Sequence, residues 1–160
     1  LDLLNDYYNF LFTKRYDNIF SSQGKLRPTI LEEFMYLLFR DVVEDLKTYA
    51  NDTDNVLKLG SVKAYSNLYF KSDDIKGFIN EIKTGVNVKD QDFAIYREIG
   101  LTINNEGRET VNLPIIAIEV KTYIDKTMLE GAIATAEKIK SGNPYSKFFV
   151  VSDSGRYPLI

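Results

Sequence analysis

Runs of apolar residues separated by turn residues mark the strands of this chain. The most apolar run, residues 115–121, follows Pro114 and is rich in β-branched side chains, as is typical of a buried strand. Because strand side chains alternate between two faces, Glu119 and Lys121 are expected on one face, and Ile118 and Val120 on the other. A carboxylate and an ammonium at the end of such a strand need partners, since burying a charge is costly.

A second strand-like run, residues 92–97, precedes this strand, and a turn cluster at residues 104–107 separates the two. A hairpin centred between Asn105 and Glu106 places Asp92 directly opposite Glu119, with their Cβ atoms about 5 Å apart. Two carboxylates at that separation repel each other unless a cation lies between them. The hairpin therefore predicts a pair of acids on one face of the sheet.

The same register places Asp90 opposite Lys121, where the two residues could form an ordinary cross-strand ion pair. A bulge near Pro114 would shift both predicted pairs by one residue. The register is therefore a hypothesis that depends on the regularity of the hairpin.

Helical periodicity appears before and after these strands. Residues 1–20 are crowded with apolar and aromatic side chains at helical spacing, and they are expected to pack on this domain or on a second subunit. Residues 28–49 form an amphipathic helix, with Glu32 and Glu33 in its first turn, where the helix dipole favours acids. Of these two, Glu32 borders the apolar face.

Three further elements complete the predicted order. A strand is expected within residues 56–70, followed by a short helix capped by Ser72. After Lys121, Thr127 and Glu130 fit a capping box that starts a helix with an apolar stripe from Met128 to Ile139. Residues 147–151 form a strand that is apolar enough to be interior.

The main elements thus run helix, strand, strand, strand, helix, strand. Consecutive strands of the hairpin are antiparallel, and the later helix can cross over to a parallel strand. The predicted fold class is α/β, a mixed β-sheet flanked by helices.

Composition narrows the chemistry that this fold can carry. The chain has 160 residues, no cysteine and no histidine, and a net charge of −3. Catalysis by Ser-His-Asp or Cys-His and zinc sites built on cysteine and histidine are therefore excluded. Carboxylates, lysines, tyrosines and a hard cation bound through oxygen are left. The acidic net charge argues mildly against a nucleic-acid partner, although a local basic stripe could still serve. The lack of cysteine suits a cytoplasmic protein, and no apolar run is long enough for a membrane span.

With an aspartate on the second strand and Glu-x-Lys on the third, the chain resembles the PD-(D/E)XK nuclease superfamily, and within it the core of type II restriction endonucleases. Asp92 matches the first acid, Glu119 the second and Lys121 the lysine, while Gln91 replaces the proline of the motif. A glutamate on the first core helix joins the metal site in many members, and Glu32 or Glu33 could match it.

The resemblance implies an αβββαβ core over residues 28–160, preceded by a helical extension over residues 1–27 and expected to continue past Ile160. It implies Mg²⁺, with Mn²⁺ as a substitute, bound by Asp92, Glu119 and the carbonyl of Val120, while Lys121 orients or activates a water. The implied reaction is hydrolysis of double-stranded DNA with 5′-phosphate and 3′-hydroxyl products.

A homodimer or heterodimer is expected, because one metal site cuts one strand and palindromic sites are two-fold symmetric. The apolar N-terminal residues offer a contact surface for it: Leu3, Leu4, Tyr7, Tyr8, Phe10, Leu11 and Phe12. The same residues would equally complete the core of their own domain.

Two other functions fit the same residues. A non-catalytic DNA- or protein-binding module on the same fold would carry Asp92, Glu119 and Lys121 as remnants or ion pairs. An unrelated α/β structural domain would show them as a polar strand edge. Binding of Mg²⁺ or Mn²⁺ separates the nuclease from both alternatives.

Overall fold

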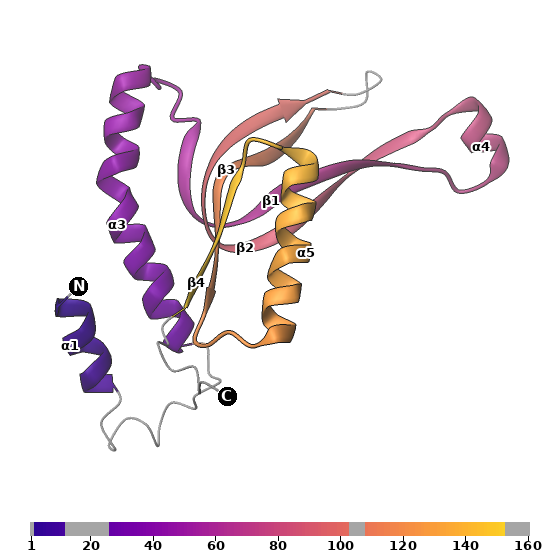
Figure 1. The fold of residues 1–160 in the computed structure, drawn as a ribbon. Helices are drawn as coiled ribbons and strands as arrows, with labels where there is room; N and C mark the ends of the chain where they lie inside the picture. Colours follow the sequence, from indigo (N-terminus) through magenta and orange to yellow (C-terminus); the bar gives the residue numbers. More distant parts are fainter. Residues whose placement is uncertain (1, 12–25, 103–107, 153–160) are drawn as a thin grey trace.

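A four-stranded mixed sheet forms the centre of the computed structural model, which describes residues 2–11, 26–102 and 108–152, and in these ranges leaves out the side chains of residues 3, 8, 11 and 26–28 (Figure 1). The elements follow one another as α1 (Asp2–Leu11), α3 (Leu26–Ala50), β1 (Leu57–Lys71), α4 (Ile75–Asn80), β2 (Lys83–Leu101), β3 (Glu109–Lys121), α5 (Lys126–Gly142) and β4 (Lys147–Ser152).

The strands lie in the order β1-β2-β3-β4. The pairs β1–β2 and β2–β3 are antiparallel, and β4 joins β3 in parallel after the crossover through α5. The predicted α/β class, with a mixed sheet flanked by helices and the core order αβββαβ, is confirmed. The strand within residues 147–151 was expected to be interior, whereas β4 lies at the end of this order, and the Phe149 side chain is half exposed.

Helix α3 covers one face of the sheet and builds the main hydrophobic core with it. Phe93 is fully buried there and stacks on Phe39, with ring centroids 5.8 Å apart. The prediction that Ile118 and Val120 share the buried face of β3 is confirmed. The buried members of this core are Ile30, Leu31, Met35, Val43, Phe93, Ile95, Ile118 and Val120.

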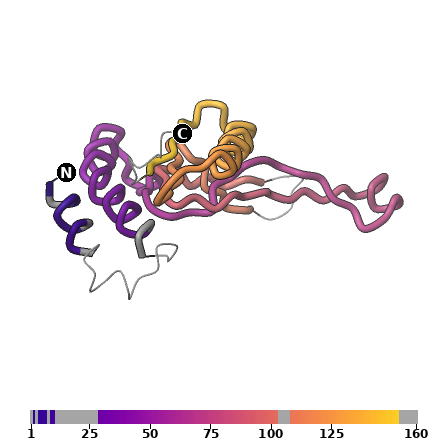
Figure 2. The backbone as a smooth tube through the Cα atoms, turned by 60° about the horizontal axis from the view of Figure 1, so that its bottom comes forward, coloured from indigo at the N-terminus to yellow at the C-terminus, as the bar shows by residue number. Residues whose placement is uncertain are grey.

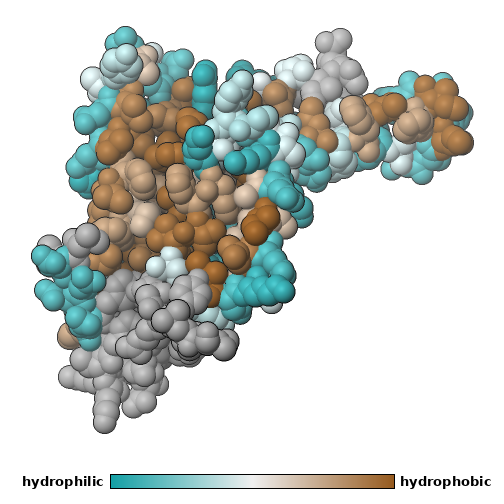
Figure 3. Space-filling view, viewed as in Figure 1, coloured by the Kyte–Doolittle hydropathy of each residue, from teal (hydrophilic) through white to brown (hydrophobic). Residues whose placement is uncertain are grey.

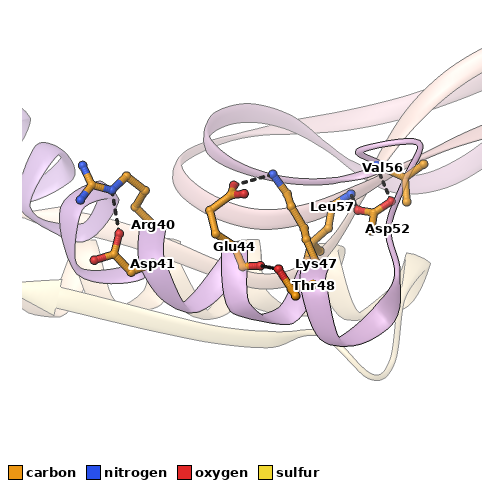
Figure 4. Close-up of polar contacts among 8 residues, drawn as sticks. All are labelled: Arg40, Asp41, Glu44, Lys47, Thr48, Asp52, Val56 and Leu57. Atoms are coloured by element: carbon orange, nitrogen blue, oxygen red, sulfur yellow. Dashed lines mark hydrogen bonds and ion pairs between the residues drawn. The ribbon is translucent and has the colours of Figure 1, made fainter.

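A tight corner joins α3 to β1 (Figure 4). The Asp52 carboxylate accepts hydrogen bonds from the backbone N–H groups of Val56 at 3.0 Å and Leu57 at 2.9 Å. These bonds, with that from Leu57 the stronger cause, lower the pKa of Asp52. Asn51 and Asn55 both take positive φ values of 52°, a conformation that asparagine tolerates better than most residues. The corner fixes where β1 begins and so how α3 lies on the sheet.

Helix α5 packs against β1 and β2, with Ala132, Thr135 and Ile139 buried. Leu129 and Ile133 were expected in the buried stripe but are about half exposed. The predicted capping box at Thr127 is wrong, because the Asp125 side chain caps the helix by accepting a hydrogen bond from the N–H of Met128 at 2.7 Å. Asp125 lies two residues earlier, so it satisfies the N–H of Met128, whereas Thr127 would have satisfied that of Glu130.

The C-terminal end of α5 closely approaches a bulge in β1. The register of β1 and β2 shifts at Ser66, which leaves the carbonyl of Ser66 turned toward the helix end, where it accepts a hydrogen bond from Ser141. A Cβ atom at Gly142 would overlap that carbonyl. Only glycine therefore fits at the end of this helix.

The distal halves of β1 and β2 leave the body of the molecule as a two-stranded arm with α4 at its tip (Figures 1 and 2). Asp74, not the expected Ser72, caps α4 by accepting from the N–H of Gly77 at 2.6 Å. The apolar side chains of α4 do not pack in a core: Ile75, Phe78 and Ile79 are 56–79% exposed. The tip therefore shows an apolar surface to solvent (Figure 3).

Among the helices that the structure describes, none combines the length and the apolar character that crossing a membrane requires.

We expect Gly142→Ala to destabilise the fold by about 1–3 kcal/mol, because the added methyl group must push the β1 backbone or the helix end away. Gly131→Ala in the same helix is the matched control: a Cβ atom there meets nothing within 4 Å. It should be neutral or stabilising by up to about 1 kcal/mol. Urea unfolding of both variants measures the difference, and equal midpoints would contradict the close approach.

Candidate active site

The hairpin register that the sequence predicts is found at the end of the sheet where the candidate acids lie. Phe93 pairs with Ile118, Ala94 with Ala117 and Ile95 with Ile116. On the turn side of a bulge at Ile115 the prediction is wrong by one residue, since Tyr96 pairs with Pro114 and Arg97 with Leu113. Asp92 and Glu119 follow directly on the last pair, and so occupy adjacent strands at one level. The turn at residues 104–107 includes positions outside the described part of the chain.

The carboxylate of Asp92 contacts β3 just beyond the last backbone pair of the β2–β3 ladder. Its Oδ2 accepts a hydrogen bond from the backbone N–H of Val120 at 2.8 Å. This bond holds the Asp92 side chain against β3, at the residue that directly follows Glu119. Asp92 is half-buried, so one oxygen is oriented by the protein while the side chain stays within reach of a ligand.

Glu119 and Lys121 form an ion pair along β3. Lys121 Nζ lies 2.8 Å from Glu119 Oε1, and the two side chains are 31% and 20% exposed. The cross-strand pair of Lys121 with Asp90 is not formed, because in the neighbouring ladder Asp90 lies opposite Lys63 of β1. The other oxygen of Glu119, Oε2, is buried and has no hydrogen-bond partner. A buried anionic oxygen without a donor is costly, so it is suited to a cation.

Glu32, on α3, is partly buried and lies near enough to Asp92 to be affected by its charge. Burial, and then the negative charge of Asp92, raise the pKa of Glu32. Glu33, its neighbour in the first turns of α3, is exposed. Of the two glutamates that the sequence offered as an additional acid, Glu32 is therefore the one electrostatically coupled to Asp92.

The residues fit a hard cation held largely by two carboxylates. Within residues 2–11, 26–102 and 108–152, no three acidic side chains lie close enough together to hold a metal ion by themselves. Mg²⁺ does not require such a cage, because it keeps several waters and is commonly bound through one or two carboxylates. Asp92 and the unpartnered Glu119 Oε2 offer two oxygens of the kind such an ion binds, and the Asp92 carboxylate contacts the N–H of Val120.

The sequence gives no role to Ser61 and treats Gln91 only as the replacement for the proline of the motif, yet the structure places both near the acids. Gln91 is only 4% exposed, and its backbone carbonyl accepts a hydrogen bond from Ser61 of β1 at 3.2 Å. A polar residue beside a candidate acid is common, and only the strand register shows that these two residues meet.

Comparisons with known proteins agree with this geometry. The sequence model of the Bpu10I restriction endonuclease family matches residues 23–154. A solved structure of the native BbvCI A2B2 tetramer matches with a TM-score of 0.52 and 25% sequence identity. That match covers 64% of this chain and 42% of the solved chain, so the present chain spans well under half of that protein. Comparison with curated protein sequences gives no match. The restriction endonuclease resemblance inferred from the sequence is confirmed.

We expect Asp92→Asn to lower the pKa of Glu32, because it removes the nearby negative charge that adds to the effect of burial. A raised carboxyl pKa means that the protonated form favours folding, so this stability is lost as pH rises from the ordinary value through the raised one. The pH range between the ordinary and the raised pKa of Glu32, over which this stability is lost, should be narrower in Asp92→Asn. Carbon-detected NMR titration of the Glu32 carboxyl group measures the shift.

Asp90→Asn is the matched control, because Asp90 lies two residues away on the same strand and does not contribute to the Glu32 shift. An equal change in both variants would show that the coupling between Glu32 and Asp92 is not specific.

Proposed function

The chain belongs to the Bpu10I restriction endonuclease family, and on that basis we propose that it is the nuclease core of a Mg²⁺-dependent type II restriction endonuclease. Its proposed substrate is double-stranded DNA, and the proposed products carry 5′-phosphate and 3′-hydroxyl ends. Mn²⁺ is expected to substitute for Mg²⁺, since both accept oxygen ligands. Residues 28–160 form the proposed core and residues 1–27 an N-terminal extension.

One observation carries this proposal: Asp92 and Glu119 lie side by side on β2 and β3, just past the last pair of their ladder, and Glu119 keeps a buried oxygen without a donor. A structural ion pair alone would leave no reason for that oxygen, because Lys121 satisfies only Oε1. A polar strand edge would be solvated rather than buried. The arrangement is best explained by a cation that both carboxylates hold.

Bound at Asp92 and Glu119, Mg²⁺ would polarise the scissile phosphate and lower the pKa of a bound water. The chain's own groups prepare that chemistry. The N–H of Val120 orients Asp92, so the carboxylate does not have to be immobilised when a ligand arrives. Lys121 lies at the same strand end, where its ammonium offsets negative charge on the phosphate and positions the attacking water.

Glu32 is proposed as a further acid of the site, and Glu33 is not. Its raised pKa means that it ionises less readily beside Asp92 while no cation is bound. A divalent cation would reverse this effect, because it favours the charged form of every neighbouring carboxylate. Glu32 would then complete the site in a step coupled to metal binding.

We also propose that the chain acts with a second subunit. The matched BbvCI structure is a tetramer described as A2B2, and a single proposed site cleaves a single strand. Helix α1 offers only part of its apolar surface to such a contact. Leu4 packs against the core of its own domain, whereas Tyr7 is 49% exposed.

The arm gives stronger support for a protein contact. Its outer part, residues 67–87, carries Lys71, Lys76 and Lys83 against Asp73, Asp74 and Glu81, so its formal charge is zero. Binding to DNA phosphates depends on an excess of positive charge, which this arm lacks. A neutral, exposed apolar tip fits a protein surface better.

Asp92→Ala and Glu119→Ala should each reduce Mg²⁺-dependent plasmid cleavage by at least about 100-fold while leaving the fold intact. Lys121→Ala should lose turnover and still bind Mn²⁺ in calorimetry, because an ammonium group does not ligate a cation. Asp90→Ala is the control that should cleave normally. Near-wild-type cleavage by the Asp92 or Glu119 variant would refute the catalytic assignment.

Ile75→Asp together with Ile79→Asp should convert the assembled protein into monomers. Their side chains are 79% and 75% exposed, so the monomer's stability should change by less than about 0.5 kcal/mol per site. Asn80→Asp, which adds one negative charge at a neighbouring exposed position, should leave assembly unchanged. Sedimentation velocity of the three proteins tests this, and identical profiles would exclude the arm as the contact.

A further inference from the structure

Asp92 lies in a β-bulge. Between the pairs Gly60↔Ala94 and Val62↔Gln91, β1 has one residue, Ser61, whereas β2 has two, Asp92 and Phe93. The extra residue twists β2 locally and can redirect a side chain. On the other edge of β2, Phe93 still pairs regularly with Ile118. The bulge thus coincides with the end of the ladder to β3, and Asp92 is the first residue past its last pair.

Two side chains brace this bulge. The Ser61 hydroxyl, from the single residue opposite it, donates a hydrogen bond to the Gln91 carbonyl at 3.2 Å. The side-chain amide of Gln91 donates to the carbonyl of Asp90 at 2.7 Å. Both bonds hold backbone carbonyls just before Asp92, where the bulge begins. Together they fix the peptide groups from which the Asp92 side chain extends.

Stability alone does not account for Gln91. Its side chain is buried, and its Oε1 has no hydrogen-bond partner. A buried acceptor that has no hydrogen bond costs free energy, and a leucine of similar size would avoid that cost. A glutamine at this position is therefore better explained by what it holds in place.

We propose that Ser61 and Gln91 are positioning residues of the active site, acting by bracing the bulge that directs Asp92 onto the N–H of Val120. This inference rests on the proposed function, because it assigns Asp92 the role of a metal ligand. Neither residue is proposed to touch the cation or the DNA. Loss of either brace lets the Asp92 carboxylate leave the Val120 N–H, which stands 2.8 Å away when the bulge is intact.

The Val120 amide signal in ¹⁵N–¹H NMR spectra reports directly on this hydrogen bond. In Ser61→Ala and in Gln91→Leu, that signal should move toward its position in Asp92→Ala. Ser61→Thr, which keeps the hydroxyl, should restore it. Ser66→Ala is the matched control: it removes a serine hydroxyl at the other bulge of β1, away from Asp92, and should leave the Val120 signal unchanged.

Calorimetry with Mn²⁺ in the absence of DNA gives the second readout. Both variants should bind Mn²⁺ about 10-fold more weakly than the wild type, as expected when a ligand loses its outer support. Gln91→Leu should do so with equal or higher thermal stability, which separates positioning from unfolding.

An unchanged Val120 signal in both variants overturns the proposal, and so does an unchanged Mn²⁺ affinity. A wild-type protein that neither binds Mn²⁺ nor cleaves DNA would refute the proposed function instead. The Val120 signal alone would then decide whether Ser61 and Gln91 position Asp92.

Discussion

The pairing of β2 with β3 is the constraint on which the site depends. A slip of one residue would turn Phe93 and Ile118 away from α3 and expose them, because strand side chains alternate between faces. The buried core therefore fixes the register, and the register brings Asp92 and Glu119 together despite their mutual repulsion. Packing energy from apolar side chains thus holds two acids where their own interaction would separate them.

This dependence explains why the site could be anticipated from the sequence. A turn cluster and two apolar runs define a register, and Glu119 and Lys121 are conspicuous because charges at the end of an apolar strand need a reason. The sequence raises a bulge near Pro114 but does not decide whether it forms, since tertiary contacts hold it: the carbonyl of Pro114 accepts hydrogen bonds from Asn143 and Ser146, beyond α5. The pairs next to Asp92 have the expected register because this bulge offsets the turn-side pairs, such as Tyr96↔Pro114, which are one residue out of the predicted register.

The helices show what a local sequence pattern cannot decide. Both Asp125 and Thr127 are suitable caps, and only the path of the chain after β3 decides that Asp125 serves. The spacing of Ile75, Phe78 and Ile79 indicates an apolar helix face, but it does not tell whether a core or another molecule covers that face. In the arm the face is exposed, because β1 and β2 carry α4 away from the sheet (Figure 2).

Charge balance links the acids of the site to one another. Glu119 is half satisfied by Lys121, Asp92 by a backbone N–H, and Glu32 by keeping its proton more readily. Each acid is therefore only partly stabilised, and keeps either an oxygen that can bind a cation or a proton that it can release. A divalent cation would supply the missing positive charge to Asp92 and Glu119, would favour the charged form of Glu32, and would free Lys121 to act on a phosphate. The same features that make the fold tolerate these acids without a metal would therefore make it responsive to one.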